Sequence, residues 1–199
     1  VAFDGANNKL YITESLYYIQ GVNLLTGRTL RPTVSKPYNI IAHDHINNLL
    51  YVYTVDRRIA ASPTLTDAPE TIIAAANSNF GLTFNGDNID ANSANINGVT
   101  AMYYDSSKNY LYYVDAGMQR VRYIDRNTNR VFTVAGGGKL RTDNILASNA
   151  SLTNLYAVAV NPVRDEVYFS QDNSINIVNR ASGIMTTLIK PDITRFNTT

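Results

Sequence analysis

The sequence predicts an all-β fold made of repeated antiparallel sheets, and three observations lead to this class. First, the chain matches itself when it is shifted by forty positions, because Ala2–Glu14 then lies over Ala42–Thr54 with the Asn pairs and the Leu-Tyr steps aligned. Second, apolar and polar residues alternate in short bursts that end in turn-forming residues, which is typical of strands and hairpins. Third, no segment has the apolar spacing of an amphipathic helix over three turns.

The repeat occurs four times. Each copy has an anchor residue at the end of its first apolar run, and these anchors are Asp4, Asp44, Asp105 and Asn161. The repeats themselves stay near forty residues, and the uneven spacing of the anchors comes from insertions at 77–96 and 137–153. We therefore divide the chain into repeats at about 1–35, 36–76, 97–136 and 154–190.

Each repeat is interpreted as four strands joined by short turns. The run before each anchor is the innermost strand, and we expect these strands, to within two residues, at Val1–Phe3, Asn39–His43, Thr100–Tyr104 and Ala157–Val160. A four-stranded meander that recurs at about forty residues is the pattern of a β-propeller blade. Both faces of a blade pack on its neighbours, which agrees with the nearly continuous apolar character of the inner runs.

The third repeat carries a family resemblance. Phe84–Gly138 resembles an NHL-repeat blade with its preceding loop: a Gly-Asp loop, a strand ending in Asp, a Leu-Tyr strand ending in Asp-Ala-Gly, an Arg-Val-Arg-Tyr-Ile-Asp strand and a Thr-Val-Ala-Gly ending. The related YWTD blades of lipoprotein-receptor ectodomains share the Leu-Tyr strand, but this chain has no Trp and its Ala-Gly endings fit NHL repeats better. The resemblance implies a propeller, commonly of six blades, that serves as a binding platform, with a minority of enzymes. We accordingly expect the four visible blades to belong to a six-bladed or larger propeller.

Composition bounds the function. The chain has 199 residues, 45% of them apolar and 17% charged, and its net charge is +1, as in an ordinary globular protein with a sizeable core. It has no cysteine, which excludes disulfides, thiolate metal ligands and thiol catalysis and leaves the redox compartment open.

Two sequons bear on the compartment. Asn149 and Asn197 each begin an Asn-X-Ser/Thr tripeptide, and Asn149 falls in an insertion that should be a surface loop. We expect both asparagines to be glycosylation sites if the protein is secreted. This favours an extracellular or cell-surface location.

The only two histidines are His43 and His45. The amidating lyases, an enzyme branch of the resembled propellers, use several histidines around a zinc ion, and here a third ligand is missing. The repeat aligns His43 with Phe3, Tyr104 and Val160, so we expect it to be a core residue. No metal, cofactor or catalytic residue is assigned, and no Ser-His-acid set is present.

Two other stretches of the sequence are candidate ligand-binding sites. Asn85–Asn92 gathers carboxylates, but Ile89 occupies the third ligand position of an EF-hand loop and no Glu follows, so a solvated loop between blades is expected. Arg120 and Arg122 share one face of a strand, with Val121 and Tyr123 on the other. A nucleic-acid site would normally add an excess of positive charge, so the arginine pair is expected to be solvated and RNA binding is not favoured.

The expected function is a non-enzymatic NHL-like propeller module for protein or glycan recognition, adhesion or structural assembly. The alternative is a propeller enzyme of the amidating-lyase type or an RNA-binding NHL domain. The sequence begins inside an inner strand and ends soon after the last strand of the fourth repeat. We therefore expect apolar faces on the first and last blades, covered by further domains of a larger protein or by neighbouring chains, with self-assembly as one form of this.

Overall fold

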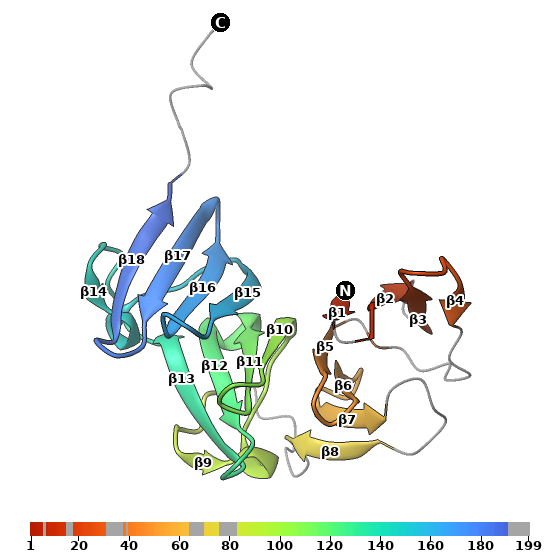
Figure 1. The fold of residues 1–199 in the computed structure, drawn as a ribbon. Coiled ribbons are helices and arrows are strands. Elements are labelled where there is room, and N and C mark those ends of the chain that lie inside the picture. The colour runs from red at the N-terminus through yellow and green to blue at the C-terminus, as the bar shows by residue number, and fades with distance from the viewer. Residues whose placement is uncertain are drawn as a thin grey trace, which may run out of the picture.

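The protein is all-β, with four antiparallel sheets arranged as a four-bladed propeller (Figure 1). The computed structural model describes residues 1–5, 7–14, 18–30, 38, 40–63, 70–75 and 83–190. Blades 1 to 4 follow the order of the chain. The expected fold class is thus confirmed.

The first two blades have four strands each, in chain order from the inner to the outer edge. Blade 1 contains β1 (Ala2–Asp4), β2 (Lys9–Glu14), β3 (Tyr18–Asn23) and β4 (Thr29–Leu30). Blade 2 contains β5 (Ile40–Asp44), β6 (Leu49–Tyr53), β7 (Ile59–Pro63) and β8 (Thr71–Ala74).

The third and fourth blades have five strands each, because a short strand from the preceding insertion adds to the outer edge. Blade 3 contains β10 (Val99–Asp105), β11 (Tyr110–Asp115), β12 (Arg120–Asp125), β13 (Arg130–Gly136) and the added β9 (Ile89–Asp90). Blade 4 contains β15 (Leu155–Asn161), β16 (Glu166–Gln171), β17 (Ser174–Asn179), β18 (Ile184–Ile189) and the added β14 (Ile145–Leu146). Single 3-10 turns lie at η1 (Ala91–Ser93), η2 (Ala116–Met118) and η3 (Ala147–Asn149).

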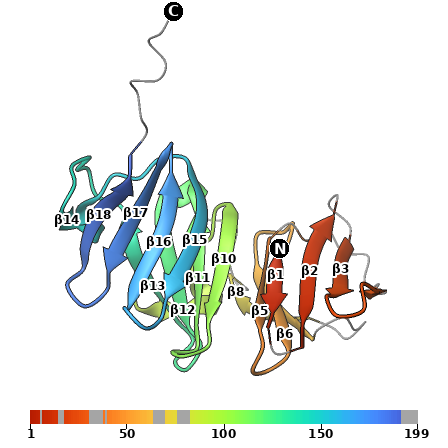
Figure 2. The same ribbon diagram turned by 45° about the horizontal axis from the view of Figure 1, so that its top comes forward.

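The inner strands β1, β5, β10 and β15 lie in sequence toward the middle of the molecule (Figures 1 and 2). Their positions confirm the expected inner strands to within two residues. They also place the four anchors at one end of the molecule. We call this the anchor end.

The anchors recur because each one caps the turn after an inner strand. Asp44 accepts hydrogen bonds from the backbone N–H groups of Ile46 and Asn47 and from the Asn47 side-chain amide, at 2.8–3.0 Å. The other three anchors accept hydrogen bonds from their own turns in the same manner. A side-chain acceptor at this place satisfies turn N–H groups that no ladder can reach.

The same turns need a left-handed residue four positions after the anchor. Asn8, Asn48, Asn109 and Asp165 occupy this position with φ between 51° and 58°. Asn and Asp tolerate the left-handed region better than other residues with a side chain, which explains why the sequence repeats them there.

Three apolar clusters fill the spaces between blades. Tyr11 and Leu50 belong to the cluster between blades 1 and 2, and Tyr51 and Tyr113 to the cluster between blades 2 and 3. The cluster between blades 3 and 4 includes Tyr112, Leu152 and Phe169, among other buried side chains. Neighbouring residues of β11 therefore enter different clusters, as alternation along a strand buried on both faces requires.

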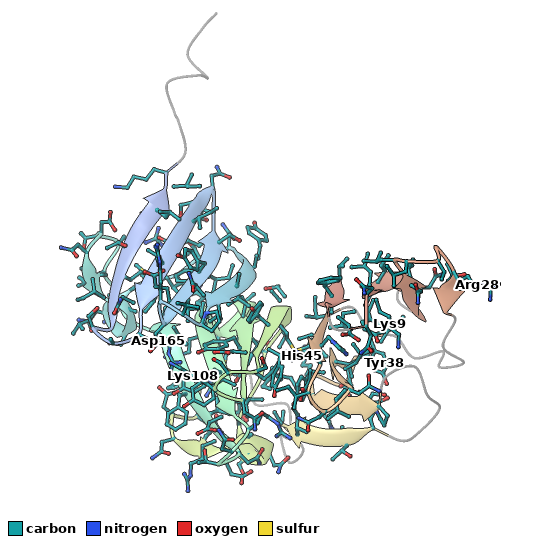
Figure 3. All side chains as sticks on the ribbon, viewed as in Figure 1. Lys9, Arg28, Tyr38, His45, Lys108 and Asp165 are labelled. Carbon is teal, nitrogen blue, oxygen red and sulfur yellow. The ribbon has the colours of Figure 1, made fainter. Side chains whose placement is uncertain are left out.

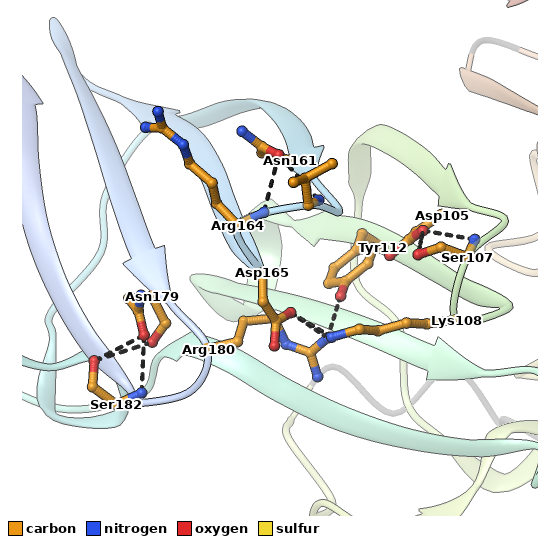
Figure 4. A network of polar contacts seen from close by, with 11 residues as sticks. Asp105, Ser107, Lys108, Tyr112, Asn161, Arg164, Asp165, Asn179, Arg180 and Ser182 are labelled. Atoms are coloured by element: carbon orange, nitrogen blue, oxygen red, sulfur yellow. Dashed lines mark hydrogen bonds and ion pairs between the residues drawn. The ribbon is translucent and has the colours of Figure 1, made fainter.

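Polar contacts also tie blade 3 to blade 4 near the anchor end (Figure 4). Lys108 Nζ lies 2.5 Å from Asp165 Oδ1, and Arg180 Nη1 lies 3.6 Å from the same oxygen. Arg180 also donates a hydrogen bond of 2.6 Å to Tyr112 Oη and packs over the rings of Tyr110 and Tyr123. These contacts fix the angle between the two blades, and we assign them a structural role.

Blades 1 and 4 each leave apolar side chains exposed, as expected. On blade 4, Tyr156 and Leu188 are 59% and 57% exposed, and Ile189 is also exposed. On blade 1, Val1 and Phe3 are exposed. The inner strand β15 is correspondingly more open to solvent than β5 and β10.

Among the described residues, no helix has the length and apolar character needed to cross a membrane.

Candidate functional site

A cavity of about 410 Å³ opens at the anchor end, next to the inner strands. All four blades contribute to it, blade 4 through Pro162. We call it the axial cup, and its lining comprises Val1, Ala2, Phe3, Ile41, Ala42, His43, His45, Met102, Tyr103, Tyr104, Asp105, Ser106, Ser107 and Pro162. Apolar, aromatic, imidazole and hydroxyl groups thus converge in one concave surface, which is typical of a binding pocket.

The acidic anchors near the cup already serve as hydrogen-bond acceptors for their own turns. Asp105 Oδ1 accepts hydrogen bonds from the Ser107 N–H and hydroxyl at 2.9 and 2.6 Å. Burial raises the pKa of Asp4, but hydrogen bonds from Asn7 and the nearby His43 outweigh it and leave that pKa below 3.8. These carboxylates hold the turns at the rim of the cup.

His43 is the most distinctive group of the cup. Its side chain is only 1% exposed, and neither ring nitrogen has a hydrogen-bond partner within the described structure. Nε2 lies 3.8 Å from Asp4 Oδ2, beyond hydrogen-bond distance, and the Tyr11 ring centroid lies 5.0 Å away. Burial lowers the pKa of His43 more than Asp4 and Asp44 raise it, so the imidazole is neutral at pH 7.

A neutral imidazole offers one donor and one acceptor, and leaving both unpaired in a buried place is costly. A ligand that reaches His43 would satisfy them. The expectation that His43 is buried is confirmed, whereas its polar atoms distinguish it from the apolar residues aligned with it.

The rim around His43 mixes exposed and half-buried groups. His45 lies in the exposed turn after β5, between blades 2 and 3 (Figure 3). Tyr103 is half-buried, and burial raises the pKa of its hydroxyl, which stays protonated at neutral pH. Exposed Phe3 adds an aromatic surface. Such a rim suits hydrogen bonding and stacking with a polar ligand.

The described residues contain no group of three or more His, Asp or Glu side chains placed to hold a metal ion. His43 and His45 are neighbours in the cup but differ in exposure, since one is buried and the other lies on the surface.

The Asn149 sequon lies away from the cup. Asn149 is exposed at the end of η3, where a side chain can be reached from solvent. Asn197 lies outside the described residues.

The expectation that Arg120 and Arg122 are solvated is wrong. Arg122 is fully buried rather than solvated, and it donates hydrogen bonds to the carbonyl oxygens of Gly86 and Asn95 at 2.9 and 3.2 Å. Arg120 is half-buried beneath Phe84, with its guanidinium carbon 3.7 Å from the ring centroid. The pair therefore organises the insertion before blade 3. The expected faces are correct, since Arg120 and Arg122 both lie against the Phe84 ring, whereas Val121 and Tyr123 pack toward blade 4.

Sequence reasoning did not single out the hydroxyl and aromatic residues of the cup. Tyr103, Ser106 and Ser107 flank the Asp105 anchor, and their position beside an anchor was the available signal. The sequence repeat does not determine the spacing between blades. That spacing brings these turns together around one cavity.

The chain is similar in fold to solved propeller-type structures. It matches a chain of a crystallised nidogen/laminin complex with a TM-score of 0.61 and 18% identity, over 94% of this chain and 60% of that one. It matches an auxiliary nutrient binding protein from Bacteroides ovatus with a TM-score of 0.62 and 18% identity, over 94% and 46% of the two chains. It also matches hydrazine synthase from Kuenenia stuttgartiensis with a TM-score of 0.59 and 12% identity, over 94% and 48%.

The chain thus spans about half to three fifths of the length of these structures. No family model matches the sequence, and no curated protein matches it. At these identities the likeness establishes the propeller fold and nothing finer.

Proposed function

We propose that this chain is an NHL-like propeller module that recognises a protein or glycan ligand through the axial cup, outside the cell and without catalysis. The observation that carries the proposal is the buried, unpartnered imidazole of His43 at the base of a cavity with an aromatic and hydroxyl rim. Sugar hydroxyls and peptide amides each supply both donors and acceptors, which is the chemistry that His43 and the rim can pair.

The structural neighbours support a binding role. One of them was crystallised in a nidogen/laminin complex, and another is described as a nutrient binding protein. An extracellular location draws support from the same two names and from the exposed Asn149 sequon.

An assembly role draws support from the free face of blade 4. The residues Tyr168, Ile177 and Thr186 form a cross-strand row on this face. The corresponding row of blade 3, Tyr112, Tyr123 and Phe132, faces blade 4. The partner that fits the free face is therefore another propeller blade, from further domains of the same protein or from a neighbouring chain.

The recognition proposal can be tested by screening the chain against arrays of glycans and peptides. Positive ligands are then titrated against Ser106→Trp, which adds bulk inside the cup, and Thr128→Trp, which adds the same bulk on an exposed turn outside it. The proposal predicts that Ser106→Trp alone loses binding. Equal binding by both variants, turnover of the ligand, stoichiometric zinc or salt-dependent RNA binding would contradict it.

A further inference from the structure

Blades 3 and 4 carry the same folded insertion. Asn88 and Asn144 both adopt left-handed backbone angles, with φ of 55° and 58°, and a two-residue strand and a 3-10 turn follow each of them. The residue before each Asn is an aspartate that accepts a hydrogen bond from the outermost long strand. Asp87 accepts from Thr133 Oγ1 at 2.8 Å, and Asp143 accepts from the Thr187 N–H at 2.6 Å. The two insertions can therefore be compared residue by residue.

In blade 3 an arginine fills the interior of the insertion. The guanidinium of Arg122 donates to the carbonyl oxygens of Gly86 and Asn95 and lies 3.8 Å from Asp87 Oδ1. The ring of Phe84 lies 5.1 Å from its central carbon. Two carbonyls, a carboxylate and an apolar side chain thus form a receptor for a guanidinium group, which the chain itself supplies.

In blade 4 the equivalent strand position holds a shorter side chain. Arg122 pairs across the ladder with Tyr113, and Asn176 pairs in the same way with Phe169. Asn176 hydrogen-bonds locally, donating to Ser174 Oγ and accepting from Thr187 Oγ1, both at 3.2 Å. It does not reach into the insertion as the longer arginine does.

A cavity of about 250 Å³ remains beside Asn176. We call it the blade-4 pocket, and its lining includes Leu140, Thr142, Asp143 and Ser151. By the residue match of the two insertions, these are the counterparts of Phe84, Gly86, Asp87 and Asn95. Every position that contacts the Arg122 guanidinium in the blade 3 insertion thus recurs in the wall of the blade-4 pocket.

The pocket offers one acceptor without a donor and one carboxylate. Gln171 Oε1 is buried and has no hydrogen-bond partner within the described structure. Asp143 is held as a carboxylate, because hydrogen bonds from the backbone of Thr187 and Asn144 and the nearby Lys190 lower its pKa.

We propose that the blade-4 pocket binds the guanidinium group of an arginine side chain or of a small guanidinium compound. A guanidinium presents planar, fixed donors that match two carbonyls and a carboxylate, as Arg122 does in blade 3. Lys190, whose Nζ lies 3.4 Å from Asp143 Oδ2, has a largely exposed side chain and moves aside when the ligand enters.

The test is an NMR titration of the full chain with N-acetylarginine amide, its neutral isostere N-acetylcitrulline amide, and N-acetyllysine amide. We expect the arginine compound alone to shift the amide signals of Thr142, Asp143 and Ser151. A Gly-Arg-Gly peptide that binds more tightly than methylguanidinium would assign the pocket to an arginine within a chain, and equal binding would assign it to small compounds.

Four variants sharpen the test. Asn176→Arg supplies the missing side chain and should reduce binding at least about tenfold, while Asn173→Arg adds the same charge on an exposed turn and should leave binding unchanged. Asp143→Asn should weaken binding, and Lys190→Gln should tighten it by about threefold because it removes a competing cation.

Three results would overturn the proposal. One is the absence of shifts with the arginine compound, and another is equal shifts with the citrulline compound. The third is weaker binding of the arginine compound in Lys190→Gln, because removal of a cation that competes for Asp143 should strengthen the binding of a guanidinium group.

Discussion

At the scale of single residues, the repeated anchors hold the turns on which the axial cup depends. Asp44 accepts three hydrogen bonds from its own turn and a fourth, of 3.3 Å, from Tyr51 Oη. The sequence repeats this residue type for a structural reason. The neighbouring residues His43 and His45 line the axial cup.

We predict that Asp44→Ala destabilises the protein by about 2–4 kcal/mol, since three donors of the turn and the buried Tyr51 hydroxyl lose a charged acceptor. Asp44→Asn keeps one acceptor oxygen and should lose less. Urea unfolding of the two variants and the parent measures the difference. A loss below about 0.5 kcal/mol in Asp44→Ala would show that the anchor is dispensable.

Asp115 gives a prediction about pH. Burial raises its pKa to about 6, although hydrogen bonds from the N–H groups of Asn97 and Met118 and the nearby arginines oppose the rise. Between about pH 4 and 6 the folded state therefore keeps a proton that the unfolded state has lost, and stability falls as the pH rises. The displacement from 3.8 to about 6 corresponds to about 3 kcal/mol.

The control for this prediction is Asp115→Asn, which keeps the Oδ1 acceptor used by both N–H groups. Between pH 4 and pH 7 the free energy of unfolding of the parent should fall by about 3 kcal/mol more than that of the variant. If the parent loses no more stability than the variant across this range, Asp115 titrates normally.

At the scale of elements, the insertions are part of the blades. Each insertion adds a short strand to the outer edge of its blade and a 3-10 turn. The 3-10 turn of the blade 3 insertion contacts blade 2, and that of the blade 4 insertion packs on blade 3. The two insertions differ in what fills them, an internal arginine in one and a cavity in the other. The strand position that supplies the arginine in blade 3, Arg122, is Asn176 in blade 4.

We predict that Arg122→Gln destabilises the protein by about 3–5 kcal/mol, because the carbonyls of Gly86 and Asn95 lose their buried charged donor. Hydrogen exchange should accelerate over residues 84–97 before it changes elsewhere. Arg28→Gln, on an exposed turn of blade 1, is the control and should change stability by less than about 0.5 kcal/mol. Unchanged exchange over 84–97 in Arg122→Gln would contradict the role given to Arg122.

The repeat made the fold predictable, whereas the site was predictable only in part. Strand period and turn residues placed the inner strands within two residues, because both are local properties of the chain. The burial of Arg122 escaped prediction because its partners lie 27 and 36 positions away in the sequence, in an insertion without regular periodicity. The cup escaped for the same reason, since residues of four blades form it and the strand period says nothing of the spacing between blades.

At the scale of the whole molecule, the described residues present separate surfaces in separate places. The axial cup lies at the anchor end, the blade-4 pocket lies between an insertion and the sheet, and apolar side chains remain exposed on blade 4. Asn149 lies outside all three.

We predict that Asn149 carries a glycan when the protein is secreted through a glycosylating pathway, because its side chain is exposed. The mass of the intact protein before and after glycosidase treatment measures this, with Asn149→Gln as the control for site assignment. An unmodified Asn149 in native material would remove the main sequence argument for an extracellular location.

Hydrogen exchange of the chain with and without a ligand from the array screen tests the central claim most directly. The account predicts protection confined to the rim of the cup, at residues 43–48 and 103–107, and lost in Ser106→Trp. Protection confined to the outer strands β13 and β18, with the rim unchanged, would contradict recognition through the axial cup.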